Sequence, residues 1–229
     1  MEIWIHRSNS ICSWKTAFMM GAHIETDVSF SPRGDIITHH PGTTDPHSTL
    51  DELLEFMKTS PNLKCCLDIK QNNKRLVNLI MQQIHGYGLE DRIYITAFQK
   101  RLAFPPFNME VGGDILIYAK KICPTIRTHL IAAFPFNLTG IVRKYNPDLI
   151  SFGWLLDNRT SQLFFKWLVA PFINLRAQIS ELKSMGVKVL GGIMNDAKDL
   201  EYFTKLGVDG IMTDNAQIAI ELINKSKIP

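Results

Sequence analysis

Short apolar segments alternate with longer amphipathic segments along most of the chain. The apolar segments are four to seven residues long and rich in Ile, Val and Leu, which favours buried strands of a parallel sheet. We predict strands at residues 3–6, 23–28, 64–69, 92–97, 125–131, 149–152, 187–193 and 210–213. In the amphipathic segments, apolar residues recur with helical spacing. We predict helices at residues 12–20, 50–57, 74–84, 136–145, 175–185, 199–206 and 216–224.

Sequence signals for helix ends support this division. Residues 49–52 read Thr-Leu-Asp-Glu, which predicts a helix start with an acidic first turn. Gly86, Gly186 and Gly207 lie where helix C-caps are expected. The segment after Phe98 has the least legible pattern of the chain.

Eight strands separated by helices predict a (β/α)8 TIM barrel of the α/β class. A chain of 229 residues is long enough to form this fold. No internal repeat, low-complexity tract or linker divides the sequence, so we expect a single domain over residues 1–229 without a separate insertion domain. The short segment at residues 36–39 would be an extra excursion at the mouth of the barrel.

Composition excludes several classes of protein. The net charge is +3 and the Lys and Arg residues are dispersed, which does not suit a nucleic-acid partner. No apolar run is long enough for a membrane span, and the first strand leaves no room for a signal peptide. The four cysteines are scattered; the adjacent Cys65 and Cys66 suit buried thiols rather than a zinc site. We therefore expect a cytoplasmic, reducing location.

Two carboxylates in the second predicted strand indicate a metal site. Glu25 and Asp27 are two residues apart, so a strand directs both side chains to the same face. Like charges held this close raise each other's pKa and repel unless a cation or a shared proton compensates. Carboxylate oxygens are ligands for magnesium or calcium rather than zinc. The alternative is a solvated strand face.

Polar or charged side chains also follow three other apolar segments. In parallel α/β folds active sites lie at the carboxyl ends of the strands, so these side chains would converge at one mouth. The residues concerned are His6, Arg7, His39, His40, Asp68 and Lys70.

In this order along the chain, the motifs resemble the glycerophosphodiester phosphodiesterase family, a group of phospholipase-C-like TIM barrels. The resemblance lies in His6-Arg7, residues 21–28, Gly34 with His40, Asp68-Ile69-Lys70, and residues 207–214. It covers most of the chain. Residues 24–30 and 208–213 are also similar to the spider-venom sphingomyelinase D enzymes of the same superfamily.

The resemblance implies roles for individual residues. His6 and His40 match the two catalytic histidines, which act as general acid and general base. The residues that match the ligands of a divalent metal, magnesium or calcium, are Glu25, Asp27 and Asp68. The residues that would face the substrate phosphate are Arg7 and Lys70, and Asn9 corresponds to a polar residue that lines the pocket rim in the venom enzymes. Trp154 is assigned to the pocket on its position just beyond the strand at residues 149–152, as an apolar wall in place of a tryptophan that the family carries elsewhere. The attacking nucleophile would be water or a neighbouring substrate hydroxyl, and the second route passes through a cyclic phosphate.

His39 and His40 compete for the second catalytic position. Six positions separate Gly34 from His40, as in the family, and Thr38 and His40 share a face, so we favour His40.

Several positions depart from the family pattern. Ser8 replaces the usual glycine, Pro41 replaces an aspartate, and Ser13-Trp14-Lys15 stands in place of Glu-Asn-Thr. The strand at residues 187–193 lacks a tryptophan that is frequent in the family. These changes suggest a reshaped substrate pocket, and the short span after His40 would open the mouth to larger substrates.

Residues 163–173 bear on the substrate because they follow a strand and so lie on the catalytic side. This apolar segment has one charged residue, Lys166, and is too short to span a bilayer. It is either a buried or lidding helix, or an interfacial patch that makes peripheral membrane contact, with Trp167 at headgroup depth.

Taken together, these observations predict a metal-dependent phosphodiesterase that hydrolyses glycerophosphodiesters to glycerol 3-phosphate and an alcohol. One rival is a phospholipid phosphodiesterase or transferase of the sphingomyelinase D type. The other is a barrel that binds phosphodiesters or membrane without turnover, which the Ser8 and Pro41 replacements favour. Retention of both histidines and all three carboxylates argues against it.

Overall fold

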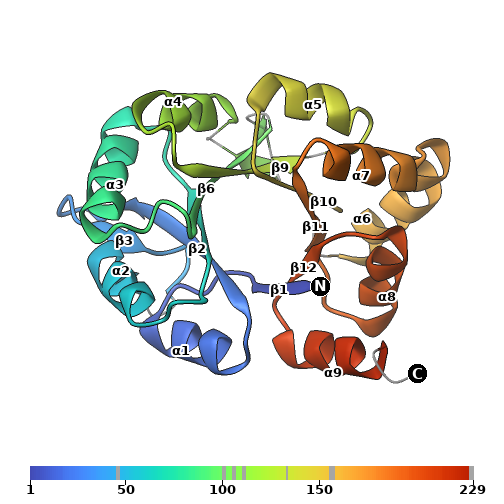
Figure 1. Ribbon diagram of the computed structural model, residues 1–229, viewed down its shortest axis with the longest axis horizontal. Helices are drawn as coiled ribbons and strands as arrows, with labels where there is room; N and C mark the ends of the chain where they lie inside the picture. The colour runs from blue at the N-terminus through green and yellow to red at the C-terminus, as the bar shows by residue number, and fades with distance from the viewer. Residues whose placement is uncertain are drawn as a thin grey trace.

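The chain folds as a closed barrel of eight parallel strands surrounded by helices (Figure 1). The computed structural model describes residues 1–44, 47–99, 102–104, 107–109, 112–132, 134–154 and 158–226, with side chains outside 102–109 and 222–226. The barrel strands are β1 (Glu2–Ile5), β2 (His23–Phe30), β5 (Cys65–Ile69), β6 (Ile93–Phe98), β9 (Arg127–Ala132), β10 (Leu149–Phe152), β11 (Lys188–Ile193) and β12 (Gly210–Thr213). Because β1 pairs with both β2 and β12, the sheet closes on itself. The predicted TIM barrel is confirmed.

Helices cover the outside of the barrel (Figure 1). They are α1 (Ile11–Met19), α2 (Leu50–Lys58), α3 (Lys74–Tyr87), α4 (Asp114–Ile122), α5 (Leu138–Tyr145), α6 (Arg159–Phe164), α7 (Leu175–Ser184), α8 (Ala197–Leu206) and α9 (Ala216–Ser226). A π-helical turn η1 (Phe165–Val169) and a 3-10 turn η2 (Ala170–Phe172) continue α6. The apolar faces of the helices form the main core against the outer face of the sheet.

Two of the described helices, α4 and α6, are not among the seven predicted helices. No helix was predicted between β6 and β9, where α4 lies after a short hairpin of β7 (Leu102–Phe104) and β8 (Phe107–Met109). The N-cap of α4 is Gly113, which has no side chain to accept a hydrogen bond from the first turn. The usual Ser, Thr, Asp or Asn start signal is therefore missing from this part of the sequence.

The predicted start of α2 is confirmed, and one predicted helix end is wrong. The Thr49 hydroxyl accepts a hydrogen bond from the Glu52 amide at 3.2 Å, and the Glu52 carboxylate accepts one from the Thr49 amide at 2.7 Å. Gly207 caps α8 with a φ of +87°. Helix α3, however, continues past Gly86 and ends at Gly88, whose φ is +66°. A left-handed backbone ends a helix, and the chain adopts it only at the second of these two glycines.

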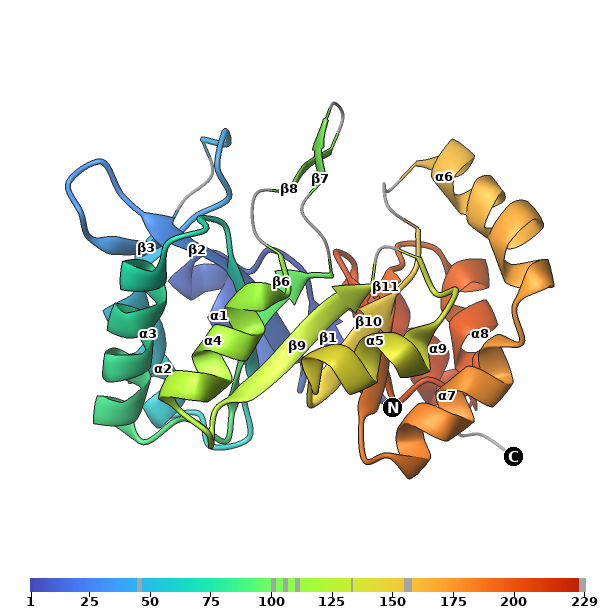
Figure 2. The same cartoon turned by 90° about the horizontal axis from the view of Figure 1, so that it is seen from above.

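The excursion at the mouth is confirmed. Strand β2 extends beyond the barrel and pairs antiparallel with β3 (Ile36–Thr38), which pairs in turn with β4 (Ser48–Thr49). This short sheet turns the chain back over the barrel, and the His39 amide donates to the Asp27 carbonyl at 2.9 Å. Figure 2 shows it on the same side of the barrel as the β7–β8 hairpin and α6.

The barrel interior is layered. Its middle contains six buried, mainly apolar side chains: Trp4, Cys66, Tyr94, Leu149, Leu190 and Met212. At the amino ends of the strands, the Glu2 carboxylate lies 2.6 Å from Lys64 and 2.8 Å from Lys188. At the carboxyl ends, the polar residues singled out in the sequence gather. The apolar layer thus separates two charged clusters inside one barrel.

The prediction for the two adjacent cysteines is confirmed. Cys65 and Cys66 are buried free thiols, as predicted. Across the described part of the chain, no helix combines the length and apolar character that crossing a bilayer requires.

Candidate active site

Three buried carboxylates form the centre of the site at the carboxyl ends of β2 and β5. Glu25 and Asp27 extend from β2 into the barrel, and Asp68 is the register partner of Asp27 on β5. Ligand oxygens of all three lie within 4.8 Å of one another. The structure therefore brings together the three residues that were predicted to bind a metal. Glu25 and Asp27 meet because alternate residues of a strand share a face, and Asp68 joins them because β5 pairs with β2.

Burial and mutual repulsion set the charge of this cluster. Burial raises the pKa of Glu25 to about 7, and the nearby negative charge of Asp27 adds to the effect. Burial likewise raises the pKa of Asp68. For Asp27, burial is outweighed by hydrogen bonds and charge from His40 and Lys70, which hold its pKa well below the usual range. Asp27 is thus ionised at neutral pH while Glu25 is close to its titration point.

Lys70 supplies positive charge to the same cluster. Its Nζ lies 2.7 Å from Oδ1 of Asp27 and also forms an ion pair with Asp68. Burial lowers the pKa of Lys70, but the surrounding carboxylates outweigh it and raise the pKa above its usual value. The ammonium group of Lys70 therefore stays charged beside the carboxylates that were predicted to bind a metal.

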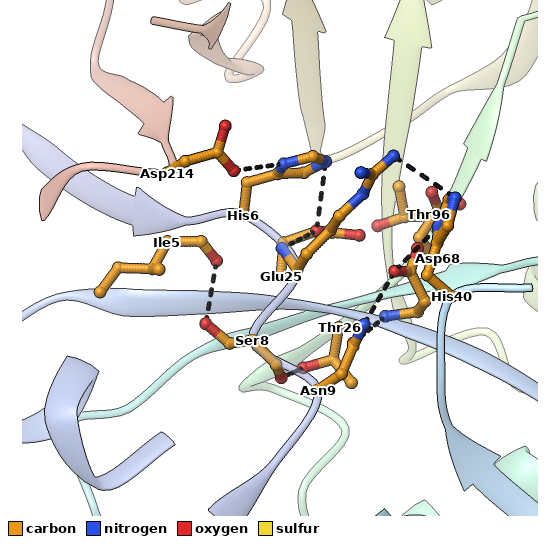
Figure 3. A network of polar contacts seen from close by, with 12 residues as sticks. Ile5, His6, Ser8, Asn9, Glu25, Thr26, His40, Asp68, Thr96 and Asp214 are labelled. Atoms are coloured by element: carbon orange, nitrogen blue, oxygen red, sulfur yellow. Dashed lines mark hydrogen bonds and ion pairs between the residues drawn. The ribbon is translucent and has the colours of Figure 1, made fainter. Parts of the chain in front are cut away.

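His6 is held by a carboxylate from the opposite end of the chain. Its Nδ1 lies 2.8 Å from Oδ1 of Asp214, which directly follows β12 (Figure 3). Its Nε2 lies 3.9 Å from Oε2 of Glu25. Burial lowers the pKa of His6, but the hydrogen bond to Asp214 and the charge of Glu25 outweigh it, and the pKa is raised.

Asn195 in turn holds Asp214. Its Nδ2 donates to Oδ2 of Asp214 at 2.7 Å, and its Oδ1 accepts from the Asp214 amide at 2.8 Å. Neither residue was assigned a role from the sequence. Asp214 lay inside the last matched motif, and an acidic residue directly after the final strand was the signal available. Asn195 carried no such signal, because its contact depends on the pairing of β11 with β12.

Of the two candidates for the second histidine, His39 and His40, it is His40 that reaches the carboxylates. Its Nδ1 lies 3.2 Å from Oδ2 of Asp27, and its Nε2 lies 3.4 Å from a terminal nitrogen of Arg7 (Figure 3). The neighbouring His39 is directed elsewhere, since its ring packs against that of His47 with a centroid distance of 5.4 Å. This geometry agrees with the preference for His40.

Arg7 occupies a strained backbone conformation. Its φ is +54°, a left-handed value that residues with a Cβ rarely adopt. The conformation directs the Arg7 amide at Oε2 of Glu25, which accepts a hydrogen bond at 2.8 Å. It also turns the guanidinium toward His40 at the site.

Asn9 lies beneath the site rather than on an open rim. Its Nδ2 donates to Oδ2 of Asp27 at 3.0 Å, and its Oδ1 accepts from the Asp27 amide at 2.9 Å. The Ser8 carbonyl accepts hydrogen bonds from the Trp14 indole at 2.5 Å and the Thr26 hydroxyl at 2.7 Å. Trp14, one of the departures from the family pattern, thus supports the loop that carries the site residues.

The structure does not bring Trp154 to the carboxylates. Its ring packs against Phe165 at a centroid distance of 6.2 Å and against Phe203 at 5.8 Å, and Lys166 lies 5.5 Å from its centre. These contacts place it under the η1 segment, between the barrel and its helices. Trp154 lies two residues beyond the end of β10 and shares the outer core with Ile150 and Phe152 of that strand, away from the barrel interior.

The donor set suits a hard divalent cation. Three carboxylates from adjacent strands offer oxygen ligands close together, and burial together with the charge of Asp27 makes the negative charge on Glu25 costly without a cation. Oxygen-only sets of this kind favour magnesium or calcium over zinc.

No family model matches the chain. The chain is 26% identical to lysophospholipase D GDPD3 of Mus musculus over 83% of its own length, and spans 56% of the length of that protein. It is 25% identical to a glycerophosphodiester phosphodiesterase of Caldanaerobacter subterraneus, over 95% of this chain and 92% of that one.

The solved structures that resemble this one have the same fold. A putative glycerophosphoryl diester phosphodiesterase from Silicibacter pomeroyi has a TM-score of 0.73 at 15% identity, over 99% of this chain and 94% of the other. An Oleispira antarctica phosphodiesterase in complex with the product sn-glycerol-3-phosphate has a TM-score of 0.67 at 16% identity, over 98% and 97% of the two chains. By sequence and by fold, the relatives of this chain are glycerophosphodiester phosphodiesterases, the family that its motifs indicate.

Proposed function

We propose that this protein is a metal-dependent phosphodiesterase that hydrolyses glycerophosphodiesters to glycerol 3-phosphate and an alcohol. The observation that carries the proposal is the arrangement of His6 and His40 around the carboxylate cluster. Each imidazole has Nδ1 within hydrogen-bond distance of a carboxylate, Asp214 for His6 and Asp27 for His40. Each therefore has its Nε2 directed into the site, beside Arg7 for His40 and beside Glu25 for His6, where it can exchange a proton with a substrate. A paired acid and base is what cleavage of a phosphodiester requires.

The hydrogen bonds support different roles for the two histidines. A guanidinium only donates hydrogen bonds, so Arg7 beside Nε2 of His40 favours an unprotonated nitrogen there. His40 is accordingly the general base that takes a proton from the nucleophile. His6, held by Asp214 and facing Glu25, is the general acid that protonates the leaving oxygen. If a substrate hydroxyl attacks first, the two roles reverse when water opens the cyclic phosphate.

Glu25, Asp27 and Asp68 would hold the divalent cation, magnesium or calcium. When bound, such an ion supplies charge neutralisation at the phosphate oxygens. Arg7 and Lys70 would add positive charge to the same phosphate, Arg7 through a planar fork and Lys70 as a point charge. Asn9 positions Asp27 for this task through its two hydrogen bonds.

The relatives support this choice of reaction. A bacterial relative is named a glycerophosphodiester phosphodiesterase, and a structural neighbour holds the product sn-glycerol-3-phosphate. We further propose that the single domain spans residues 1–229. A cytoplasmic location is proposed on the four free thiols.

The direct test is release of glycerol 3-phosphate from glycerophosphocholine and glycerophosphoethanolamine, with magnesium, calcium or a chelator. We expect metal-dependent turnover by the wild type, and its loss in His40→Ala. His39→Ala is the matched control, because this neighbouring histidine packs on His47 and not on Asp27. Equal loss in both variants, or turnover that survives in His40→Ala, would contradict the assignment. Detection of a cyclic phosphate during turnover would identify the substrate hydroxyl as nucleophile.

A second candidate is an intact-lipid or lysolipid phosphodiesterase, including a transferase of the sphingomyelinase D type. The observation that favours it is the exposed apolar segment at residues 163–173, which we propose as a peripheral membrane contact. One sequence relative is also named a lysophospholipase D. Faster turnover of a lysophospholipid than of its deacylated headgroup would select this candidate. Binding of either substrate without turnover by folded wild-type protein would indicate a non-catalytic barrel.

A further inference from the structure

Exposed apolar side chains are concentrated in two neighbouring connections of the barrel. In the described part of the chain, fourteen large hydrophobic side chains are exposed, and seven of them belong to the β9–α5 and β10–α7 connections. We call these seven the apolar surface: Phe134, Phe136, Leu163, Phe164, Trp167, Leu168 and Phe172. Trp167 is 72% exposed and Phe172 is 79% exposed. Exposure of side chains this large indicates an interaction surface.

The two connections lie at the catalytic end of the barrel and are joined to each other. Both follow the carboxyl ends of their strands, where the histidines and carboxylates gather. Gln178 of α7 donates to the Pro135 carbonyl at 3.1 Å and accepts from the Leu138 amide at 2.8 Å. In Figure 2, α6 rises on the side of the barrel that also carries β3 and the β7–β8 hairpin. The apolar surface is thus beside the mouth.

The η1 segment is anchored on one face and exposed on the other. Phe165 and Val169 are buried, and Phe165 stacks on Phe203 of α8 at a centroid distance of 6.0 Å. Lys166 forms an ion pair with the buried Asp199 of α8. These contacts occupy the inward face and leave Trp167 and Leu168 outward. The segment is therefore held in place with Trp167 and Leu168 exposed, so it is not a fully buried helix, and the lidding helix and the interfacial patch remain as interpretations.

The charges around the apolar surface favour an anionic partner. Residues 158–180 contain no Asp or Glu. Arg159 and Arg176 lie at the two ends of the segment, and both are exposed and without an ion pair among the described residues. Protein segments that bind the interface of an anionic bilayer combine large apolar side chains with nearby arginines or lysines.

We propose that the apolar surface docks on an anionic lipid bilayer, with Trp167 and Phe172 inserted at headgroup depth and the mouth of the barrel facing the membrane. This inference rests on the proposed function, since docking would bring the catalytic histidines to phosphodiesters in or near the lipid surface. Insertion of roughly 5–10 Å is enough to bury side chains of this size. The occupant is the bilayer itself rather than a second copy of the chain.

Tryptophan fluorescence offers a direct test on the full chain. Of the four tryptophans, Trp4, Trp14 and Trp154 are buried, so Trp167 is the one whose environment would change on docking. The wild type is mixed with vesicles of phosphatidylcholine alone, and with vesicles that also contain phosphatidylglycerol. We expect a blue shift and quenching by brominated lipid with the anionic vesicles, and a weaker response with phosphatidylcholine alone.

Matched variants separate insertion from general loss of apolar surface. Phe172→Ser should lower vesicle partitioning in a sedimentation assay by roughly tenfold, or about 1.4 kcal/mol, because the bilayer no longer buries a large apolar side chain at this position. Met19→Ser is the control: Met19 is also 79% exposed but lies at the C-terminal end of α1. We expect this control to partition like the wild type. Both variants should hydrolyse soluble glycerophosphodiesters at the wild-type rate, because neither residue contacts the site.

The outcomes are distinct. Absence of both blue shift and co-sedimentation with anionic vesicles overturns docking, and leaves the phosphodiesterase proposal standing if soluble substrate is hydrolysed. Equal loss in Phe172→Ser and Met19→Ser also overturns it. A concentration-dependent dimer that dissociates in Phe172→Ser, without vesicle binding, would assign the surface to a second copy of the chain. Vesicle binding without turnover of any substrate would support docking and refute the proposed function.

Discussion

Replacing Asp214 with asparagine tests how the site controls the proton on His6. The substitution keeps the size of the side chain but removes the charge that faces Nδ1 of His6 at 2.8 Å. An amide can also donate to Nδ1, which favours the wrong tautomer of the imidazole. The pKa of Asp214 itself is lowered, because burial is outweighed by its hydrogen bond to His6, so the carboxylate is charged at neutral pH.

The magnitude follows from the role of a general acid. A positioned acid or base contributes roughly 10²–10⁴ to the rate. The Asp214 side chain is 46% exposed, so solvent screens its charge. The expected loss of rate therefore lies at the lower end of this range. We expect kcat to fall by roughly 10²-fold, or about 2.7 kcal/mol in activation free energy, with KM little changed.

The assay is steady-state release of glycerol 3-phosphate across a range of pH. Asp214 raises the pKa of His6 against the opposing effect of burial. Because the general acid must be protonated, activity falls as pH rises through that pKa, and Asp214→Asn should move this alkaline limb to lower pH. Asp209→Asn is the control: Asp209 accepts from the Val189 amide at 2.9 Å at the opposite end of the barrel. A variant with kcat within about twofold of wild type and an unmoved alkaline limb would refute the assignment.

Three further predictions concern the metal and the stability of the barrel. Magnesium or calcium at a hundredfold excess over Kd should stabilise the wild type by about 2.7 kcal/mol, seen as a higher melting temperature, and should not stabilise Asp68→Asn. The gain should shrink below pH 7, because protons compete with the metal at Glu25, whose pKa is raised to about 7. Glu2→Gln should lower the free energy of unfolding in urea by about 1–3 kcal/mol, since it leaves Lys64 and Lys188 without their counter-charge, while metal-dependent turnover is retained. Burial lowers the pKa of His129 to about 3, so the unfolded chain takes up the proton first as pH falls; this should cost about 2 kcal/mol of stability between pH 7 and pH 5, a dependence absent from His129→Asn in urea unfolding at the two pH values.

Local patterns in the sequence were sufficient to predict the barrel. Each predicted strand is a short apolar segment, and all eight occur within about two residues of the expected ends. The pairing of Glu25 with Asp27 was also predictable, because alternation along a strand depends only on neighbouring residues. The start of α2 at Thr49 could be predicted for the same reason, since a capping box involves residues three positions apart.

The predicted residues of the site converge because of the fold class. Once eight parallel strands are expected, their carboxyl ends must meet at one mouth. That single inference brought His6, His40 and Asp68 together before any distance was known. Their assigned roles remain proposals that the activity measurements test.

Other features could be decided only by the tertiary structure, because they depend on contacts between distant segments. Asp214 is 208 positions from His6, and closure of the barrel by β1 and β12 makes them neighbours. Trp154 was expected in the pocket, but the packing of α8 and η1 provides Phe203 and Phe165 on the outer side. Local patterns encode which residues form an element and which face they share. Which distant partner meets that face is decided by closure of the barrel and by the packing of helices on it.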